Sequence, residues 1–465
     1  MMESDNQAMQ QVLDKIYDRF SEGFRAATGP SGDGASRRIG AELKFALVKP
    51  DGTAVSRETV AALWDFLAER GWELVLDSMS GAPSGARIAG EQNDTVASCE
   101  TGYCKTEFSL AHSADLNAVD RQLTELKTLL RAFGESHDSH FLGFGTLPGT
   151  APGAELIARK ERASFWDRVF PSNHFIDAED GDDVHLFTVN VASHVHVSVA
   201  EDEAVAAVNV LNGFAPAQVA LMADSCVWKG KYDPEHKCVA EVFWDMWEAA
   251  KNRAGMPPRP FEDCRDYARH VAELAPVYVK RNGAPIILKD YDSFLAYAAA
   301  EDAQGHDPDG ARVSIEPSMN DLDTHNSCYW YNARISRYYT VENRVCDQQP
   351  PEDLLCPAAL TLGLVEARHE AWEALEGHDW AVLRAARVEA CKHGIEARAN
   401  GLAVRDLAGD MLEVAKRGLE RRGKGEERFL EPLTLRLRDG RCPADGAAEV
   451  FHTGGAEALV ARRAI

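Results

Sequence analysis

Apolar and polar residues alternate with a period of two in four segments of the chain, and this pattern predicts four β-strands. Successive side chains of a strand point to opposite faces, so each segment has one apolar face and one polar face. The polar faces carry Glu42 and Lys44 in residues 39–48, Lys105, Glu107 and Ser109 in residues 105–111, His194, His196 and Ser198 in residues 186–199, and Thr340, Glu342, Arg344 and Cys346 in residues 339–346. The apolar face of the last segment carries Tyr339, Val341, Asn343 and Val345. For each strand taken singly, a polar face that meets water is the simpler interpretation.

Segments with a 3.6-residue period predict helices over residues 7–26, 57–70 and 116–133. Ser56 is expected at the N-cap of the second helix and Gly71 just past its end. Residues 28–36 (TGPSGDGAS) have the composition of a flexible linker, and residues 201–225 predict a helical pair interrupted at Gly213 and Pro216. Residues 140–149 predict a strand that runs into a loop. Residues 229–323 are predicted to be irregular, helices are expected from residue 348 to about 422, and the tail from 424 is expected to mix loop and short helix.

The predicted strands are few and are separated by helical stretches of unequal length, without regular βαβ alternation. This order favours an α+β fold with a largely antiparallel sheet over a doubly wound fold. We expect an N-terminal helix and linker over residues 1–36 and one catalytic domain over residues 37–425. Residues 426–465 are expected to form a C-terminal extension that packs on the same domain.

The chain has 465 residues, a formal net charge of −24 and an isoelectric point near 5.1. An acidic surface argues against nucleic acid and anionic membranes as general partners. No apolar run reaches the roughly 18 residues of a membrane span, and the N-terminus lacks signal-peptide features. Ten cysteines without a CxxC pair indicate reduced, mostly structural thiols in the cytoplasm and argue against a zinc site. Small molecules are therefore the expected partners, and a homodimer is left open.

Two nucleotide-binding motifs can be set aside from the sequence. No GxxxxGK[ST] phosphate loop is present. Residues 143–149 (GFGTLPG) are rich in glycine, but they lack the strand–loop–helix context of a dinucleotide-binding fingerprint. A nucleotide would have to be bound through metal ions and cationic side chains instead.

Four polar strand faces that meet would form one pocket lined by carboxylates, imidazoles and cations. Carboxylates and imidazoles hold Mg²⁺ or Mn²⁺, which bridge polyphosphate oxygens. Arg and Lys neutralise the charge on a transferred phosphoryl group. The recurrence over four strands favours this interpretation, although His194 or His196 alone is more often a hydrogen-bonded structural residue.

The segments IGAELKF, CETGYCKTEFSLA, SHVHVSV and YWYNARISRYYTVENRVCD resemble the glutamate–cysteine ligase superfamily, and most closely its bacterial carboxylate–amine ligase branch. The order and spacing of these motifs match from about Arg38 to Ala367, and the last motif is the most specific. The resemblance implies a curled antiparallel sheet that forms a funnel-shaped active site flanked by helices, as in the glutamine synthetase and guanido kinase-like catalytic fold. It also implies use of ATP and Mg²⁺ to form a γ-glutamyl phosphate that an amine attacks.

The resemblance carries roles to individual positions of this chain. It implies metal ligation by Glu42, Glu100, Glu107 and Glu342, ATP phosphate binding by Lys44, Lys105 and Arg344, and substrate binding by Arg334 and His196. Arg344 and Glu342 are the implied catalytic pair. Cysteine is the default amine, which implies a place in glutathione biosynthesis, and a different amino acid or small amine is the alternative.

Lys44 departs from the pattern, because the family's first strand usually reads Gly-x-Glu-x-Glu. A cation at this position removes or reshapes one metal site, stands in for a metal charge near the phosphates, or turns to solvent. The departure puts the metal count and the glutamate–cysteine activity in question. Two rival functions follow: a non-catalytic member of the fold that binds a nucleotide or an amino acid, and a purely structural acidic protein, which leaves the four polar faces unexplained.

Overall fold

The computed structural model describes residues 2–28, 37–78, 80–90, 93–160, 166, 183–247 and 252–465. Its main feature is an open antiparallel sheet with the strand order β16-β17-β7-β1-β5-β4-β3-β2, in which β6 also pairs with β1. The strands are β1 (Ile39–Val48), β2 (Glu73–Leu76), β3 (Pro83–Ile88), β4 (Thr95–Cys99), β5 (Lys105–Ser109), β6 (His140–Leu142), β7 (Ala192–Ser198), β16 (Ala333–Ile335) and β17 (Thr340–Asp347). The four predicted strands are all in this sheet, which confirms the α+β fold with a mainly antiparallel sheet.

Helices cover one face of the sheet at its centre. The valines of β7 and β17, such as Val195 and Val341, are buried under α5 (Glu201–Gly213), α6 (Ala215–Met222) and α11 (Cys356–Glu366). Asn343 lies on this apolar face because its Nδ2 donates to Gln218 Oε1 of α6 at 2.7 Å and to Thr361 Oγ1 of α11 at 2.8 Å. A buried polar side chain is tolerated where such partners are supplied. The opposite face of the sheet is thereby left for polar chemistry.

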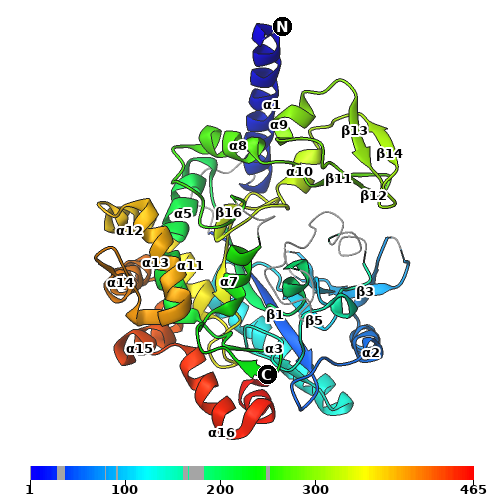
Figure 1. The fold of residues 1–465 in the computed structure, drawn as a ribbon. Helices are drawn as coiled ribbons and strands as arrows, with labels where there is room; N and C mark the ends of the chain where they lie inside the picture. The colour runs from blue at the N-terminus through cyan, green and yellow to red at the C-terminus, as the bar shows by residue number, and fades with distance from the viewer. Residues whose placement is uncertain are drawn as a thin grey trace.

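Further helices flank the sheet on several sides (Figure 1). They are α2 (Arg57–Ala68), α3 (Leu116–His137), α7 (Val239–Met246), α12 (Arg368–Leu375), α13 (Trp380–His393), α14 (Val404–Arg422), α15 (Glu431–Asp439) and α16 (Pro443–Arg463). As predicted, Ser56 caps α2, accepting from Thr59 N at 3.2 Å, and Gly71 follows with a positive φ of 88°. The predicted tail of loop and short helix is wrong for residues 443–463, which form the long helix α16 with a kink at Gly455.

The end of the chain contacts the central sheet. Ile465 N donates to Phe141 O of β6 at 2.9 Å, and Arg463 Nη2 donates to the buried Asp224 Oδ1 at 2.9 Å. These contacts agree with an extension that packs on the main domain, while the boundaries 1–36, 37–425 and 426–465 stay predictions. Only Thr28 of the linker is among the described residues, and the helix before the linker, α1 (Met2–Thr28), is longer than expected.

Residues 229–323 were predicted to be irregular, and this prediction is wrong. They contain a second antiparallel sheet of β11 (Tyr278–Arg281), β12 (Ala284–Ile287), β13 (Ala303–His306) and β14 (Arg312–Ile315). The short helices α8 (Cys264–Glu273), α9 (Phe294–Ala298) and α10 (Asp321–His325) lie near them at the top of Figure 1: α8 and α9 contact α1, and α10 contacts β11. Two-residue strands complete the described part of the chain: β8 (Val227–Trp228) with β9 (Lys231–Tyr232), β10 (Ala254–Gly255) with β15 (Trp330–Tyr331), and β18 (Arg398–Ala399) with β19 (Leu402–Ala403).

Two strand boundaries differ from the expected ones, both for local reasons. The strand expected over residues 186–199 begins only at Ala192, because residues 183–188 form a short 3₁₀ helix. That turn directs Phe187 O and Asn190 Oδ1 onto the buried ammonium of Lys105, at 2.9 and 2.8 Å. Tyr339 precedes β17 with a positive φ of 57°, so it leaves the expected apolar face and lines the cavity described below. The side chain of Cys346 lies outside the described part of the molecule.

Buried His325 in α10 makes the stability of the protein depend on pH. Its side chain is 2% exposed, its Nε2 donates to Val271 O at 2.8 Å, and burial lowers the pKa of His325 from 6.5 to about 4. The folded state therefore binds fewer protons than the unfolded state between pH 6.5 and 4, so its stability is lost as the pH falls through this window. We expect this residue to account for roughly 3 kcal/mol of lost unfolding free energy between pH 7 and 4. The measurement is urea unfolding of wild type and His325→Gln across pH; parallel curves from pH 7 to 4 would contradict it.

Candidate active site

The uncovered face of the main sheet opens into a cavity of about 860 Å³. Each predicted site residue lines it: Glu42, Lys44, Glu100, Lys105, Glu107, His196, Arg334, Glu342 and Arg344. Neighbouring strands bring them together through their register, since β1 pairs Glu42 with His194 and Lys44 with Glu107, and β17 pairs Glu342 with His196. The expectation that Glu42, Glu107, His196 and Glu342 share one face is thus met by the geometry.

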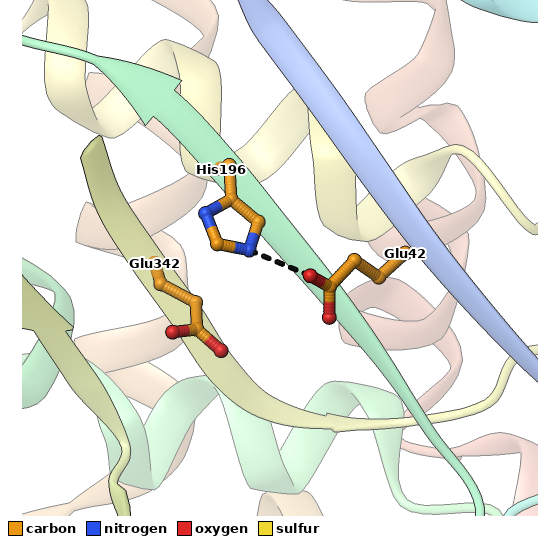
Figure 2. A group of neighbouring side chains, drawn as sticks. All are labelled: Glu42, His196 and Glu342. Carbon is orange, nitrogen blue, oxygen red and sulfur yellow. Dashed lines mark hydrogen bonds and ion pairs between the residues drawn. The ribbon is translucent and has the colours of Figure 1, made fainter. Parts of the chain in front are cut away.

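Glu42, His196 and Glu342 form a cluster, here called the acid–imidazole cluster. The strands β1, β7 and β17 contribute one side chain each. The ligand atoms of the three side chains lie within 4.8 Å of one another, and the side chains point toward a common point (Figure 2). His196 Nε2 lies 3.0 Å from Glu42 Oε1, and Glu42 raises the pKa of His196 against the opposing effect of burial. Two carboxylates and one imidazole suit a hard divalent cation such as Mg²⁺ or Mn²⁺.

Two arginines neutralise Glu342, which is only 2% exposed. Arg334 Nε donates to Glu342 Oε2 at 2.7 Å, and Arg344 Nη1 donates to Glu342 Oε1. Although burial opposes ionisation, Arg334 and Arg344 hold the pKa of Glu342 well below its ordinary value. The resemblance implied that Arg344 binds ATP phosphates and that Glu342 ligates metal. In the structure the two side chains pair directly, so a ligand phosphate would share Arg344 with Glu342.

Lys44 lies at the centre of a second group, the lysine-centred cluster of Lys44, Glu42, Glu107 and Glu100. Its side chain is 5% exposed, and its Nζ lies 2.8 Å from Glu107 Oε2 and 3.3 Å from Glu42 Oε2. Burial disfavours the ammonium, but Glu107, Glu42 and Glu100 together raise the pKa of Lys44 above its ordinary value. The alternative that Lys44 turns to solvent is therefore wrong, and its charge occupies the space between two of the expected metal ligands.

Glu100 and Glu107 lie apart from the acid–imidazole cluster and contact each other. Burial raises the pKa of Glu107 to about 7, with Glu42 and Glu100 adding to the effect and Lys44 opposing it. A protonated Glu107 donates a hydrogen bond to Glu100, whose pKa is lowered mainly by Lys44 against the opposing effect of burial. Among the described residues, the geometry thus groups only Glu42 and Glu342 of the four expected metal carboxylates, and His196 joins them.

Lys105 was expected to contact ATP phosphates, but its ammonium is engaged inside the protein. It is 4% exposed and donates to Phe187 O and Asn190 Oδ1. Burial lowers the pKa of Lys105 to about 8, with Glu100 opposing the shift. Its charge still acts on the cavity, which it lines.

Several cavity residues had been assigned no role from the sequence. His194 lies on the same face as His196, and its Nδ1 lies 3.0 Å from Lys44 Nζ; burial, Lys44 and Arg344 lower the pKa of His194 to about 3, which keeps it neutral. The alternation already placed His194 on this face. Asn326 and Asn332 also line the cavity. Neither belongs to a strand, so no local alternation in the sequence could identify them.

An open antiparallel sheet whose cavity face brings together three possible metal-ligand atoms and two arginines has side chains that suit a polyphosphate bound with a divalent cation. A family model described as glutamate–cysteine ligase family 2 matches residues 38–462. The chain therefore belongs to glutamate–cysteine ligase family 2, and it is a ligase of the carboxylate–amine type. The family and enzyme class expected from the sequence are confirmed.

Relatives and a solved structure agree with this assignment. The chain is 25% identical over 428 residues to glutamate–cysteine ligase A, chloroplastic, of Oryza sativa subsp. indica, covering 90% of this chain and 81% of the relative. It is 26% identical to the chloroplastic glutamate–cysteine ligase of Arabidopsis thaliana, covering 89% and 76%. The fold is similar to that of glutamate–cysteine ligase from Francisella tularensis in complex with AMP, with a TM-score of 0.56, 11% identity and coverage of 92% and 87%.

No single helix among the described residues is long and apolar enough to cross a membrane. The helices α5 and α6 pass that test only as a pair, and they are bent by 53° at their junction. Both pack against the apolar face of the main sheet.

Proposed function

We propose that this ligase uses ATP to activate the γ-carboxyl group of glutamate as an acyl phosphate, which an amine then attacks. The observation that carries the proposal is the meeting of the acid–imidazole cluster with Arg344 and Arg334 in one cavity. Cysteine, the acceptor in the names of the relatives, is the reference amine, and with cysteine the reaction belongs to glutathione biosynthesis.

The chemistry divides into two steps. A carboxylate oxygen attacks the γ-phosphorus of ATP, and the bond to the leaving ADP oxygen breaks. The amine nitrogen then attacks the acyl carbon, a C–N bond forms, inorganic phosphate leaves and the nitrogen loses a proton. In this proposal Arg344 donates to the phosphoryl oxygens during the first step, and Arg334 stays on Glu342 and holds its orientation.

The side chains present fit a divalent cation at the acid–imidazole cluster, because three ligand atoms of the right type converge there. Glu42, His196 and Glu342 would hold Mg²⁺ or Mn²⁺, which supplies charge neutralisation for polyphosphate oxygens. The ammonium of Lys44 already forms ion pairs with both Glu107 and Glu42. We therefore propose fewer metal ions at this site than the four predicted carboxylates would hold without a lysine.

The test of the proposed function does not depend on the identity of the amine. Purified protein is incubated with ATP, Mg²⁺, glutamate and hydroxylamine, which traps an acyl phosphate as a hydroxamate. We expect ADP and γ-glutamyl hydroxamate to form in equal amounts, and neither to form without glutamate. Nucleotide or glutamate binding without any ADP release would instead favour the non-catalytic binding protein.

Replacing Lys44 by glutamate should increase the number of bound divalent cations. An ammonium cannot ligate a metal, whereas a carboxylate between Glu107 and Glu42 adds hard oxygen ligands. We expect Lys44→Glu to bind one more Mn²⁺ per chain than wild type, measured by calorimetry in the presence of a non-hydrolysed ATP analogue. Lys49→Glu is the control, because it makes the same charge change at an exposed position just beyond β1. An equal number of bound Mn²⁺ ions per chain in wild type and Lys44→Glu would show that residue 44 does not border a metal site.

A further inference from the structure

One end of the cavity is built from four large aromatic side chains, here called the aromatic wall: Phe187, Trp244, Trp247 and Trp330. Their rings contact one another in sequence. The centroid distances are 4.2 Å for Phe187–Trp244, 4.8 Å for Phe187–Trp247, 5.4 Å for Trp247–Trp330 and 5.6 Å for Trp244–Trp330. Trp244 and Trp330 are stacked, with 27° between their planes, and both remain partly exposed.

The aromatic wall adjoins the proposed site of phosphoryl transfer. Trp330, Asn332 and Arg334 all line the cavity, and Asn332 O accepts from Arg344 N at 2.7 Å. Asn332 lies opposite Arg344, and Trp330 comes two residues before Asn332. Two residues of extended chain span roughly 7 Å, so the backbone of Trp330 lies about that far along the chain from the position opposite Arg344. On the other side, Phe187 O accepts from the ammonium of Lys105. A group held against the wall would therefore lie near the chain segments that carry Arg344 and Lys105.

Asn332 supplies a polar atom at the same end of the cavity. Its side chain is 3% exposed, and its Nδ2 donates to Glu241 Oε2 at 2.9 Å. That bond fixes the orientation of the amide, because Glu241 is also paired with Arg387 and accepts hydrogen bonds. Asn332 Oδ1 is then a buried acceptor with no hydrogen-bond partner among the described residues. A buried acceptor of this kind is costly unless a ligand N–H reaches it.

We propose that the aromatic wall binds the acceptor substrate, and that this substrate is an amine that carries an uncharged aromatic ring. This inference rests on the proposed function. Aromatic rings pack against tryptophan in offset or edge-to-face arrangements, whereas the side chain of cysteine would cover only a small part of such a wall. Lys105 and Arg344 lie beside the wall, and Glu241 at this end of the cavity is already paired with Arg387 at 3.0 Å, so a neutral ring suits the wall better than a cationic side chain.

The adenine ring of ATP is the other flat ring with N–H donors that the reaction brings to the cavity. Two phosphates and a ribose separate adenine from the γ-phosphorus, whereas the acceptor nitrogen must touch the acyl carbon. The short span from Arg344 to Trp330 therefore favours the acceptor. Adenine at the wall is the alternative that the experiment must exclude.

The experiment measures glutamate-dependent ADP release by the full chain with phenethylamine, phenylalanine, cysteine and 2-aminobutyrate as acceptors. We expect kcat/KM for an aromatic amine to exceed that for 2-aminobutyrate and cysteine at least tenfold. Trp330→Leu and Trp244→Leu should each lower kcat/KM for the aromatic amine at least tenfold and change the KM for ATP less than twofold. Trp372→Leu, which replaces a half-buried tryptophan of α12 outside the cavity, should change neither.

Binding is measured separately by titrating phenethylamine and ADP against tryptophan fluorescence in wild type and Trp330→Leu. Quenching by phenethylamine that Trp330→Leu weakens, with unchanged ADP affinity, supports the inference. The inference is overturned if cysteine or 2-aminobutyrate reacts with a kcat/KM equal to that of the aromatic amines. It is also overturned if the variant selectively loses affinity for ADP, because that result would place adenine at the wall. Hydroxamate formation separates the two proposals: if it occurs while aromatic amines are rejected, only this inference fails, and if it is absent, the proposed function fails.

Discussion

Arg344→Ala is expected to lower ATP turnover by about 10²–10³, which corresponds to roughly 3–4 kcal/mol of transition-state stabilisation. Its guanidinium is always charged and cannot ligate a metal, so its proposed contribution is electrostatic. Arg344→Lys should recover only part of the loss, because a lysine lacks the planar pair of donors. Glu342→Gln should weaken the use of Mg²⁺ and ATP, since it keeps the volume of the side chain and removes its charge. The measurement is glutamate-dependent ADP release for the three variants.

Folding must be checked in the same variants, because Arg344 neutralises a buried carboxylate. Arg334 also pairs with Glu342, at 2.7 Å, and this pair does not involve Arg344, so we expect Arg344→Ala to fold and to melt cooperatively. Arg87→Ala is the control: Arg87 is an exposed residue of β3 that pairs with Glu73 of β2 at 2.9 Å, outside the cavity. A folded Arg344→Ala protein with nearly normal ADP release would mean that Glu342 and Arg344 are an ordinary polar strand face.

Lys44→Met should reduce the free energy of unfolding by about 3–5 kcal/mol at pH 8, the scale for removing one partner of a buried ion pair. The variant keeps the length of the side chain but leaves Glu42, Glu107 and Glu100 without their shared cation. The loss should be smaller at pH 5, because carboxylates left unpaired take up protons as the pH falls. Urea unfolding at both pH values, with EDTA present so that no metal replaces the ammonium, provides the measurement.

Lys49→Met is the matched control, since Lys49 follows the same strand and is exposed. It should change the free energy of unfolding by less than about 0.5 kcal/mol at either pH. A loss below about 1 kcal/mol for Lys44→Met at pH 8 would show that the carboxylates do not depend on Lys44 for their neutralisation.

The strand faces of the site could be predicted because alternation is a local property of the sequence. Glu42, His196 and Glu342 each sit on the polar side of a period-two segment, and the register of β1, β7 and β17 then brings them together. The same pattern could not show that Lys44 faces Glu107, because that contact depends on which strand pairs with β1. Pairing partners are set by the whole sheet and not by either strand alone.

The second sheet has a local signal in the sequence, the Asn-Gly pair at residues 282 and 283. Asn282 and Gly283 both have positive φ, 52° and 82°, and they join β11 to β12. An Asn-Gly pair between two short extended runs is the strongest local indication of a hairpin. The aromatic wall had no such signal. Phe187, Trp244 and Trp330 come from distant parts of the chain, and their rings contact one another only in the folded protein.

The pairing of three cavity carboxylates, Glu42, Glu107 and Glu342, with cations of the same chain has a practical consequence. Glu342 is held by two arginines, and Glu42 and Glu107 by one ammonium, so the charges are balanced before any ion arrives. Metal-dependent folding occurs where a site cannot be assembled without its ion, as in zinc fingers. Here a chelating agent should stop catalysis and leave the melting temperature almost unchanged, so the protein can be purified, stored and reloaded with a chosen metal without passing through an unfolded state.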